Sequence, residues 1–90
     1  MLIKLDVKLL MLKINADYQL DTIGLNCPEP VMMLHNKIRD AGAGETILVL
    51  ASDPSTERDV PKFCKFLGHK LISQTREGNE YHYLIKKKTS

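Results

Sequence analysis

Residues 46–51, with the sequence Thr-Ile-Leu-Val-Leu-Ala, form a short continuous apolar run between Glu45 and Ser52. A run of this kind, bounded by polar residues, is typical of a strand that is buried on both faces of its sheet. The sequence therefore predicts a central strand here, and the other predicted elements are arranged around it.

Two segments have the periodicity of one-sided helices. The first is predicted from about residue 28 to about residue 40, where the sequence Ala-Gly-Ala-Gly-Glu ends it. The second ends near Gly68, and Pro61 predicts that it starts close before that proline, because proline fits the first turn of a helix. The apolar positions are Val31, Leu34, Ile38 and Ala41 in the first segment, and Val60, Phe63, Cys64 and Leu67 in the second.

Further strands are predicted at residues 18–23, 70–75 and 81–86, the last two joined by a turn at Arg-Glu-Gly-Asn. The order β-α-β-α-β-β predicts an α+β fold, a two-layer α/β sandwich with a four-stranded mixed sheet and both helices on one face. Residues 3–9 alternate between apolar and polar side chains and predict either an extra N-terminal strand or a leader. We therefore expect an N-terminal extension at residues 1–13 and a single domain at residues 14–90.

Composition excludes several classes of protein. A chain of 90 residues with 43% hydrophobic and 27% charged residues is typical of one small globular domain. The net charge of +2 is too small to indicate nucleic-acid binding by itself. Two cysteines do not make a disulfide-rich scaffold, and charged residues interrupt the N-terminal apolar residues, so we expect a cytoplasmic protein.

Cys27 stands at the predicted start of the first helix, directly before Pro28, Glu29 and Pro30. Unpaired N–H groups at a helix N-terminus favour a thiolate, whereas the carboxylate of Glu29 opposes it. With Pro28 at the first helical position, both prolines stiffen the turn without losing an intrahelical hydrogen bond. A buried structural cysteine is the alternative, but Cys27 lies off the apolar stripe, which favours a reactive thiol.

The sequence Cys-Pro-Glu-Pro lacks the second cysteine of a C-x-x-C redox motif, and no Cys–His–Asn constellation is evident. A single exposed thiolate can instead hold a sulfur atom as a persulfide and surrender it to another thiol, which needs no deep pocket. Cys64 lies on an apolar stripe and is predicted to be a core residue. Its alternative role, as a resolving thiol in a redox switch with Cys27, remains open here.

The stretches LDTIGLNCPEPVMML, GETILVLASDPSTERDVPKFCKFLGHKL and EYHYLIKK together resemble the SirA/TusA family of sulfur carriers over roughly residues 17–87. The resemblance implies a two-layer α/β sandwich in which Cys27 accepts persulfide sulfur from a cysteine desulfurase of the IscS type. It also implies a relay through TusBCD-type and TusE-type proteins to 2-thiolation of the tRNA wobble uridine, with tRNA contacted only indirectly. Pro28 and Pro30 would shape the loop.

Some positions depart from the family pattern. Asn26 stands where the family often has arginine, and His35 stands where a close relative has arginine, while Arg39 is retained. These residues are candidate partner contacts, and His35 would make docking sensitive to pH. Met32 is a candidate adaptable contact beside the thiol, although methionines here are more typical of a core. Asp53 and Arg58 are candidates for helix-start stabilisation and for partner contact.

Two other interpretations are weighed against sulfur transfer. The three histidines and two cysteines show no ligand spacing such as C-x₂-C or H-x₃-H, so neither a metal nor a cofactor is expected. The basic residues 86–88 are typical of a solvated chain end. They also leave open a non-catalytic regulatory module that binds RNA or protein, in which Cys27 would be incidental. Other acceptors, such as molybdenum-cofactor maturation, remain open as well.

Overall fold

The computed structural model describes residues 16–89 and contains four strands and two helices within that range. In chain order they are β1 (Tyr18–Thr22), α2 (Glu29–Asp40), β2 (Thr46–Ala51), α3 (Thr56–Leu67), β3 (Lys70–Glu77) and β4 (Glu80–Lys86). This is the predicted order. The strand expected at residues 3–9 and the domain boundary expected near residue 13 lie outside the described residues.

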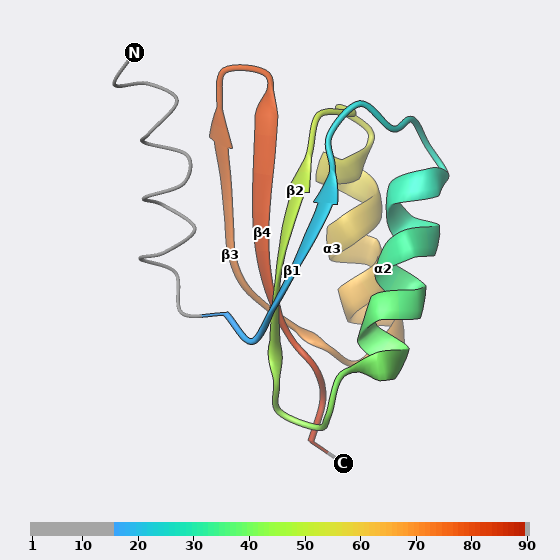
Figure 1. Ribbon diagram of the computed structural model, residues 1–90, viewed down its shortest axis with the longest axis vertical. Coiled ribbons are helices and arrows are strands. Elements are labelled where there is room, and N and C mark those ends of the chain that lie inside the picture. The colour runs from blue at the N-terminus through green and yellow to red at the C-terminus, as the bar shows by residue number, and fades with distance from the viewer. Residues whose placement is uncertain (1–15, 90) are drawn as a thin grey trace.

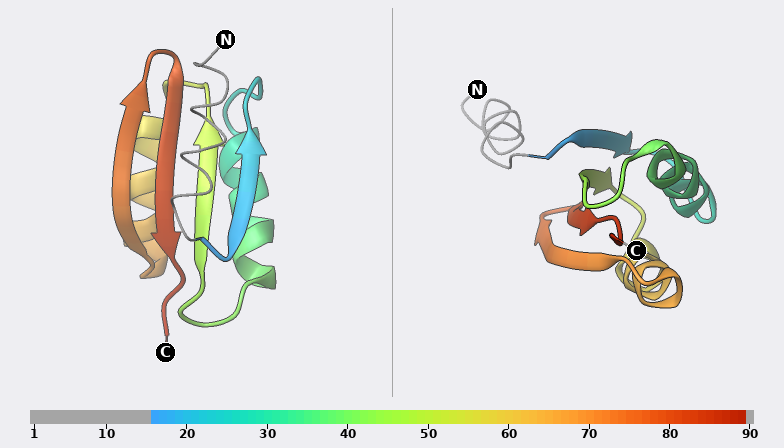
Figure 2. Two further views of the ribbon diagram at one scale, coloured as in Figure 1. Left: turned by 60° about the vertical axis from the view of Figure 1, so that its left-hand side comes forward. Right: turned by 90° about the horizontal axis from the view of Figure 1, so that it is seen from below.

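The four strands form one mixed sheet in the order β1-β2-β4-β3. β1 and β2 are parallel, whereas β4 is antiparallel to both β2 and β3. Both helices cover the same face of the sheet, with α2 and α3 side by side (Figures 1 and 2). The predicted α+β fold with both helices on one face is therefore confirmed.

β2 lies inside the sheet, and its last five residues are buried. Ile47, Val49 and Ala51 point toward the helices and belong to the main core, whereas Leu48 and Leu50 are buried on the other face. The alternation follows from the two-residue repeat of a strand. The prediction of a central strand covered on both faces is thus confirmed.

The two helical stripes meet over this strand. In α2 the buried stripe runs through Leu34 and Ile38 and continues to Ala41 just after the helix. In α3 it includes Val60, Phe63 and Cys64. Leu67, at the end of the second predicted stripe, is only partly buried, and so is Val31 at the start of the first.

The position of Pro61 differs from the prediction. α3 begins at Thr56, so Pro61 is the sixth residue of the helix and not a residue of its first turn. Proline has no N–H, and the carbonyl of Glu57 therefore lacks its usual partner four residues later. The side-chain amide of Gln74 on β3 donates to that carbonyl at 3.4 Å and partly replaces the missing bond. The prediction that the helix starts close before Pro61 was wrong.

The ends of three strands also differ slightly from the predicted ends. β3 and β4 extend to a two-residue connection, Gly78 and Asn79, which is shorter than the predicted four-residue turn. Gly78 has φ of 60°, a value that glycine adopts at little cost in a tight hairpin. β1 ends at Thr22, whose buried hydroxyl donates to the carbonyl of Leu50 on β2 at 2.7 Å.

Candidate functional site

Cys27 lies in the loop between β1 and α2, and its side chain is exposed. α2 begins at Glu29, and Pro28 is the N-cap, with φ of −97° and ψ of 11°. The predicted placement of Pro28 at the first helical position was therefore wrong by one residue, and Cys27 lies just outside the helix. Pro30, the second helical residue, is buried, while Glu29 is exposed in the first turn. The Cys27–Pro28 peptide bond is cis.

The loop that carries Cys27 is bonded to the loop that follows β2. Because β1 and β2 are parallel neighbours, their carboxyl ends lie at the same edge of the sheet. The amide of Gly24 donates to Ser52 Oγ at 2.8 Å, and the amide of Cys27 donates to Asp53 Oδ2 at 2.5 Å. Within the loop, the amide of Glu29 donates to the carbonyl of Asn26 at 2.9 Å. The backbone at Cys27 is thus fixed from two sides, by the loop that follows β2 and by a turn within its own loop.

The thiol of Cys27 faces the first turn of α3. Its Sγ donates to Asp59 Oδ2 at 3.4 Å, and Asp59 Oδ1 accepts from Arg58 Nε at 3.1 Å. Asp59 is partly buried, whereas Arg58 is largely exposed. An exposed thiol therefore has one carboxylate beside it and an arginine paired to that carboxylate.

The backbone N–H groups of Ser55 and Cys27 lower the pKa of Asp53 below its ordinary value, with a smaller contribution from the charge of Arg58. A carboxylate that accepts backbone N–H bonds is stabilised in its charged form. Asp53 is consequently ionised at neutral pH while it holds both loops.

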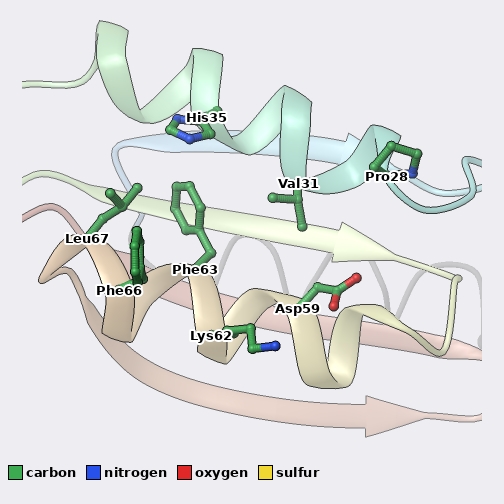
Figure 3. A pocket seen from close by; sticks show the side chains of 8 residues that line it. All are labelled: Pro28, Val31, His35, Asp59, Lys62, Phe63, Phe66 and Leu67. Atoms are coloured by element: carbon green, nitrogen blue, oxygen red, sulfur yellow. The ribbon is translucent and has the colours of Figure 1, made fainter.

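An open groove of about 510 Å³ runs between α2 and α3, starting beside Cys27 at Pro28. Figure 3 shows Pro28, Val31 and His35 on its α2 side. The α3 side carries Asp59, Lys62, Phe63, Phe66 and Leu67. Phe66 is 87% exposed at the rim, and Met32 on α2 is 59% exposed. Two large apolar side chains are therefore open to solvent on the helical layer that also carries the thiol.

The structure brings some of the predicted site residues together and separates others. Asn26 precedes Cys27 and is exposed, Asp53 bonds to the amide of Cys27, and Arg58 pairs with Asp59 beside the thiol. His35 lines the groove, where its ring packs edge-to-face on Phe63 with centroids 5.0 Å apart. Arg39 is in the last turn of α2, at the far end of that helix from Cys27, and bonds to Asn36 at 2.9 Å. It does not line the groove.

Sequence reasoning missed Asp59, Lys62 and Phe66 as site residues. From the sequence, Asp59 is interpreted like Asp53 and Arg58, as a helix-start residue and secondarily as a partner contact. Its position beside the Cys27 thiol was missed, because nothing in the sequence shows that α3 begins beside the Cys27 loop. Phe66 carried a usable signal, since a large aromatic that lies off the apolar stripe of an amphipathic helix is exposed.

Comparison with known proteins adds evidence from most of the chain. The model of the family described as "Sulfurtransferase TusA" matches residues 18–87. The chain belongs to the TusA family. It is 60% identical over 74 residues to the protein named "Sulfur carrier protein TusA" of Pseudomonas aeruginosa strain LESB58, covering 82% of this chain and 94% of that protein. The protein of the same name from Pseudomonas syringae pv. syringae is 54% identical over 76 residues, with coverages of 84% and 90%.

A solved structure of another protein has the same fold as this chain. The crystal structure of the SirA-like protein from Desulfitobacterium hafniense matches with a TM-score of 0.70 and 19% identity, covering 79% of this chain and 97% of that one. At this identity the match concerns the fold alone. The TusA-type fold of the chain, with two helices on a four-stranded mixed sheet, is thus supported by an experimental structure.

The second cysteine of this TusA-family chain is part of the core. Cys64 is 2% exposed, and burial raises the pKa of its thiol to about 11. Both cysteines are free, one exposed and the other buried. This agrees with the interpretation of Cys64 as a packing residue, and the contrast in exposure gives no support to a redox pair with Cys27.

The basic C-terminal residues lie near the carboxyl end of α3. Lys70, Lys86, Lys87 and Lys88 line a shallow hollow of about 200 Å³, together with Gly68 and Thr89. Lys87 Nζ donates to the carbonyl of Ala41 at 2.7 Å.

Within residues 16–89, no three His, Cys, Asp or Glu side chains are grouped closely enough to hold a metal ion. Neither described helix is long and apolar enough to cross a bilayer.

Proposed function

We propose that the protein carries sulfur as a persulfide on Cys27. It accepts the sulfur from a cysteine desulfurase of the IscS type and passes it to relay proteins of the TusBCD and TusE type, for 2-thiolation of the tRNA wobble uridine. The observation that carries the proposal is an exposed thiol on a backbone held from two sides, in a chain of the TusA family.

The chemistry needs only the thiol and a partner. The Cys27 thiolate attacks the terminal sulfur of the donor's cysteine persulfide, the donor's S–S bond breaks, and the donor leaves as a thiolate. Cys27 then carries the terminal sulfur through a new S–S bond. In the second step an acceptor thiolate attacks that terminal sulfur and Cys27 leaves as a thiolate, so no net oxidation or reduction occurs.

Partner docking is supported by the outer surface of the two helices, which begins at the thiol and extends to Phe66 in the last turn of α3 (Figure 3). Phe66 and Met32 offer exposed apolar area, and the groove between α2 and α3 begins next to Cys27 at Pro28. Exposed aromatic and methionine side chains are enriched in protein interfaces. Asn26, His35 and Arg58 surround this surface as candidate polar contacts for the donor, and Arg39 extends it along α2.

The test is a loading assay with purified desulfurase and cysteine. Wild type is expected to gain the mass of one sulfur atom, which intact-protein mass spectrometry and peptide mapping place on Cys27. Cys27→Ser is expected to gain nothing, and Cys64→Ser serves as the matched control that still loads. If wild type stays unmodified, or if Cys27→Ser loads as well as wild type, the proposal is wrong.

The acceptor is tested separately. Loaded protein is mixed with a TusE-type acceptor in the presence and absence of the TusBCD complex, and the sulfur is followed by mass. In cells that lack their own carrier, wild type is expected to restore 2-thiouridine in tRNA, whereas Cys27→Ser is not. Loading by the desulfurase without restoration of 2-thiouridine would indicate a different acceptor pathway.

The hollow lined by four lysines favours a second candidate, a non-catalytic module that binds RNA or an acidic protein. The two functions predict opposite results. For the binding module, Cys27→Ser keeps full cellular activity, and charge reversal at Lys86, Lys88 or Arg39 abolishes it. For the sulfur carrier, the cysteine variant is inactive and charge reversal at Lys86 or Lys88 does not prevent loading by the desulfurase.

A further inference from the structure

We propose that Asp53 is a positioning residue for Cys27, which fixes the backbone from which the thiol is presented to its partners. The inference rests on the proposed function and goes beyond it, because it assigns the rigidity of the Cys27 loop to one carboxylate on a different loop. Sequence reasoning treated Asp53 as a helix-start residue or a partner contact, and neither interpretation includes its bond to the amide of Cys27.

Both oxygens of the Asp53 carboxylate are used inside the molecule. Oδ2 accepts the amide hydrogen of Cys27 at 2.5 Å, and Oδ1 accepts the amide hydrogen of Ser55 at 3.1 Å. Hydrogen bonds from N–H groups to a charged carboxylate are stronger than those to a neutral acceptor. One side chain therefore bridges the loop before α2 and the loop before α3.

Asp53 is itself anchored to the core. Its carbonyl accepts the amide hydrogen of Thr56 at 3.0 Å and the hydroxyl hydrogen of Thr56 at 2.7 Å. The Thr56 hydroxyl is also bonded to the hydroxyl of Tyr83 at 2.8 Å, and both residues are fully buried. A chain of hydrogen bonds thus connects the Cys27 amide, through Asp53 and Thr56, to Tyr83 on the inner strand β4.

Transfer of a sulfur atom between two cysteines requires the attacking sulfur to approach in line with the bond that breaks. Small misplacements of a reacting group cost large factors in rate, up to about a hundredfold for 1 Å. A loop without the Asp53 bridge would present the thiol at a range of angles. We therefore expect Asp53 to act on every transfer that Cys27 undergoes, whatever the size of the donor.

The experiment compares Asp53→Ala and Asp53→Asn with a matched control, Asp21→Ala. Asp21 lies at the same sheet edge, but its carboxylate accepts from the amide of Ile23 and not from that of Cys27. Loading rates are measured with two donors, the desulfurase and glutathione persulfide, which is too small to use a protein docking surface. Asp53→Ala is expected to slow both by about tenfold to a hundredfold, Asp53→Asn less, and Asp21→Ala hardly at all.

A second readout is the amide resonance of Cys27 in ¹H–¹⁵N spectra. In wild type this resonance is expected far downfield, because the amide donates to a carboxylate, and to titrate with the lowered pKa of Asp53. In Asp53→Asn it moves upfield and loses that titration. The titration is lost because asparagine does not ionise. This readout uses Asp53→Asn alone, so it can be obtained even if Asp53→Ala fails to fold.

The outcomes separate the two levels of the proposal. Asp53→Ala could raise only the KM for the desulfurase and leave the Cys27 resonance and the reaction with glutathione persulfide unchanged. In that case Asp53 is a partner contact and the inference is wrong. If wild type reacts with glutathione persulfide but not with any desulfurase, the proposed donor is wrong. Slow loading of Asp53→Ala by the small donor would still support positioning in that case.

Discussion

Replacing Tyr83 by phenylalanine tests the buried hydrogen bonds beneath the site. The single proton of the Thr56 hydroxyl goes to the carbonyl of Asp53 at 2.7 Å, so the Tyr83 hydroxyl must be the donor in its 2.8 Å bond to Thr56. Burial raises the pKa of Tyr83, which keeps this hydroxyl protonated. Tyr83→Phe removes the donor but leaves Thr56 bonded to Asp53, so we expect a loss of about 1 kcal/mol in the free energy of unfolding.

Replacing Thr56 by valine should cost more. It removes the bond to Asp53 and also leaves the Tyr83 hydroxyl buried without a partner, so we expect a loss of about 2–4 kcal/mol. The double variant no longer contains that orphaned hydroxyl. Its loss in the free energy of unfolding should therefore be smaller than the sum of the losses in the two single variants. Tyr81→Phe is the matched control, because Tyr81 is also buried in β4 but takes no part in the bond to Thr56.

Urea unfolding followed by circular dichroism measures these differences. With a slope of about 1 kcal/mol per M for a small domain, Tyr83→Phe should lower the midpoint by about 1 M and Thr56→Val by about 2 M or more. An unchanged midpoint for Tyr83→Phe, or strictly additive losses in the double variant, would refute the argument that these two hydroxyls form one buried chain.

Three further predictions follow from burial and charge. Leu34→Ala should lower the free energy of unfolding by about 2–5 kcal/mol and Met32→Ala by less than about 0.5 kcal/mol, because only Leu34 is buried; equal losses in urea would contradict this. Iodoacetamide at pH 8 should label Cys27 at once and Cys64 only after unfolding, as followed by mass, since a thiol with a pKa of about 11 is almost entirely protonated there. Burial and the charges of nearby lysines lower the pKa of His69, so its contribution to stability is present above about pH 6.5 and is lost as the pH falls toward the lowered value. A His69→Gln variant should therefore show a smaller drop in urea midpoint between pH 7.5 and 5.5, and an identical drop would contradict the assignment.

Local patterns were enough to predict the architecture. The run at residues 46–51 became β2 with the predicted bounds, and the end of α2 at Asp40 also agrees. These elements are specified by side-chain periodicity, which any window of the sequence contains. Errors arose where tertiary contacts compensate for an unfavourable residue. Pro61 is tolerated inside α3, where the Gln74 amide donates to the carbonyl that proline leaves free.

The candidate site was predicted only in part for a related reason. The exposure of Cys27 agrees with the prediction from its motif, because the stiff turn and the position off the stripe are local features. The contacts of Cys27 with Asp53 and Asp59 join residues 26 and 32 positions apart, and no periodicity encodes them. The groove beside Phe66 likewise depends on how α2 and α3 lie next to each other.

The parallel pairing of β1 with β2 has a consequence for protein engineering. With Thr22 opposite Ala51, the segment after each strand leaves the sheet from adjacent positions. A cysteine turn transplanted alone into another scaffold would leave behind the carboxylate that holds it. Residues 22–29 and 51–59 would have to be moved together, onto two neighbouring strands that run in the same direction, for the sulfur atom to keep its orientation.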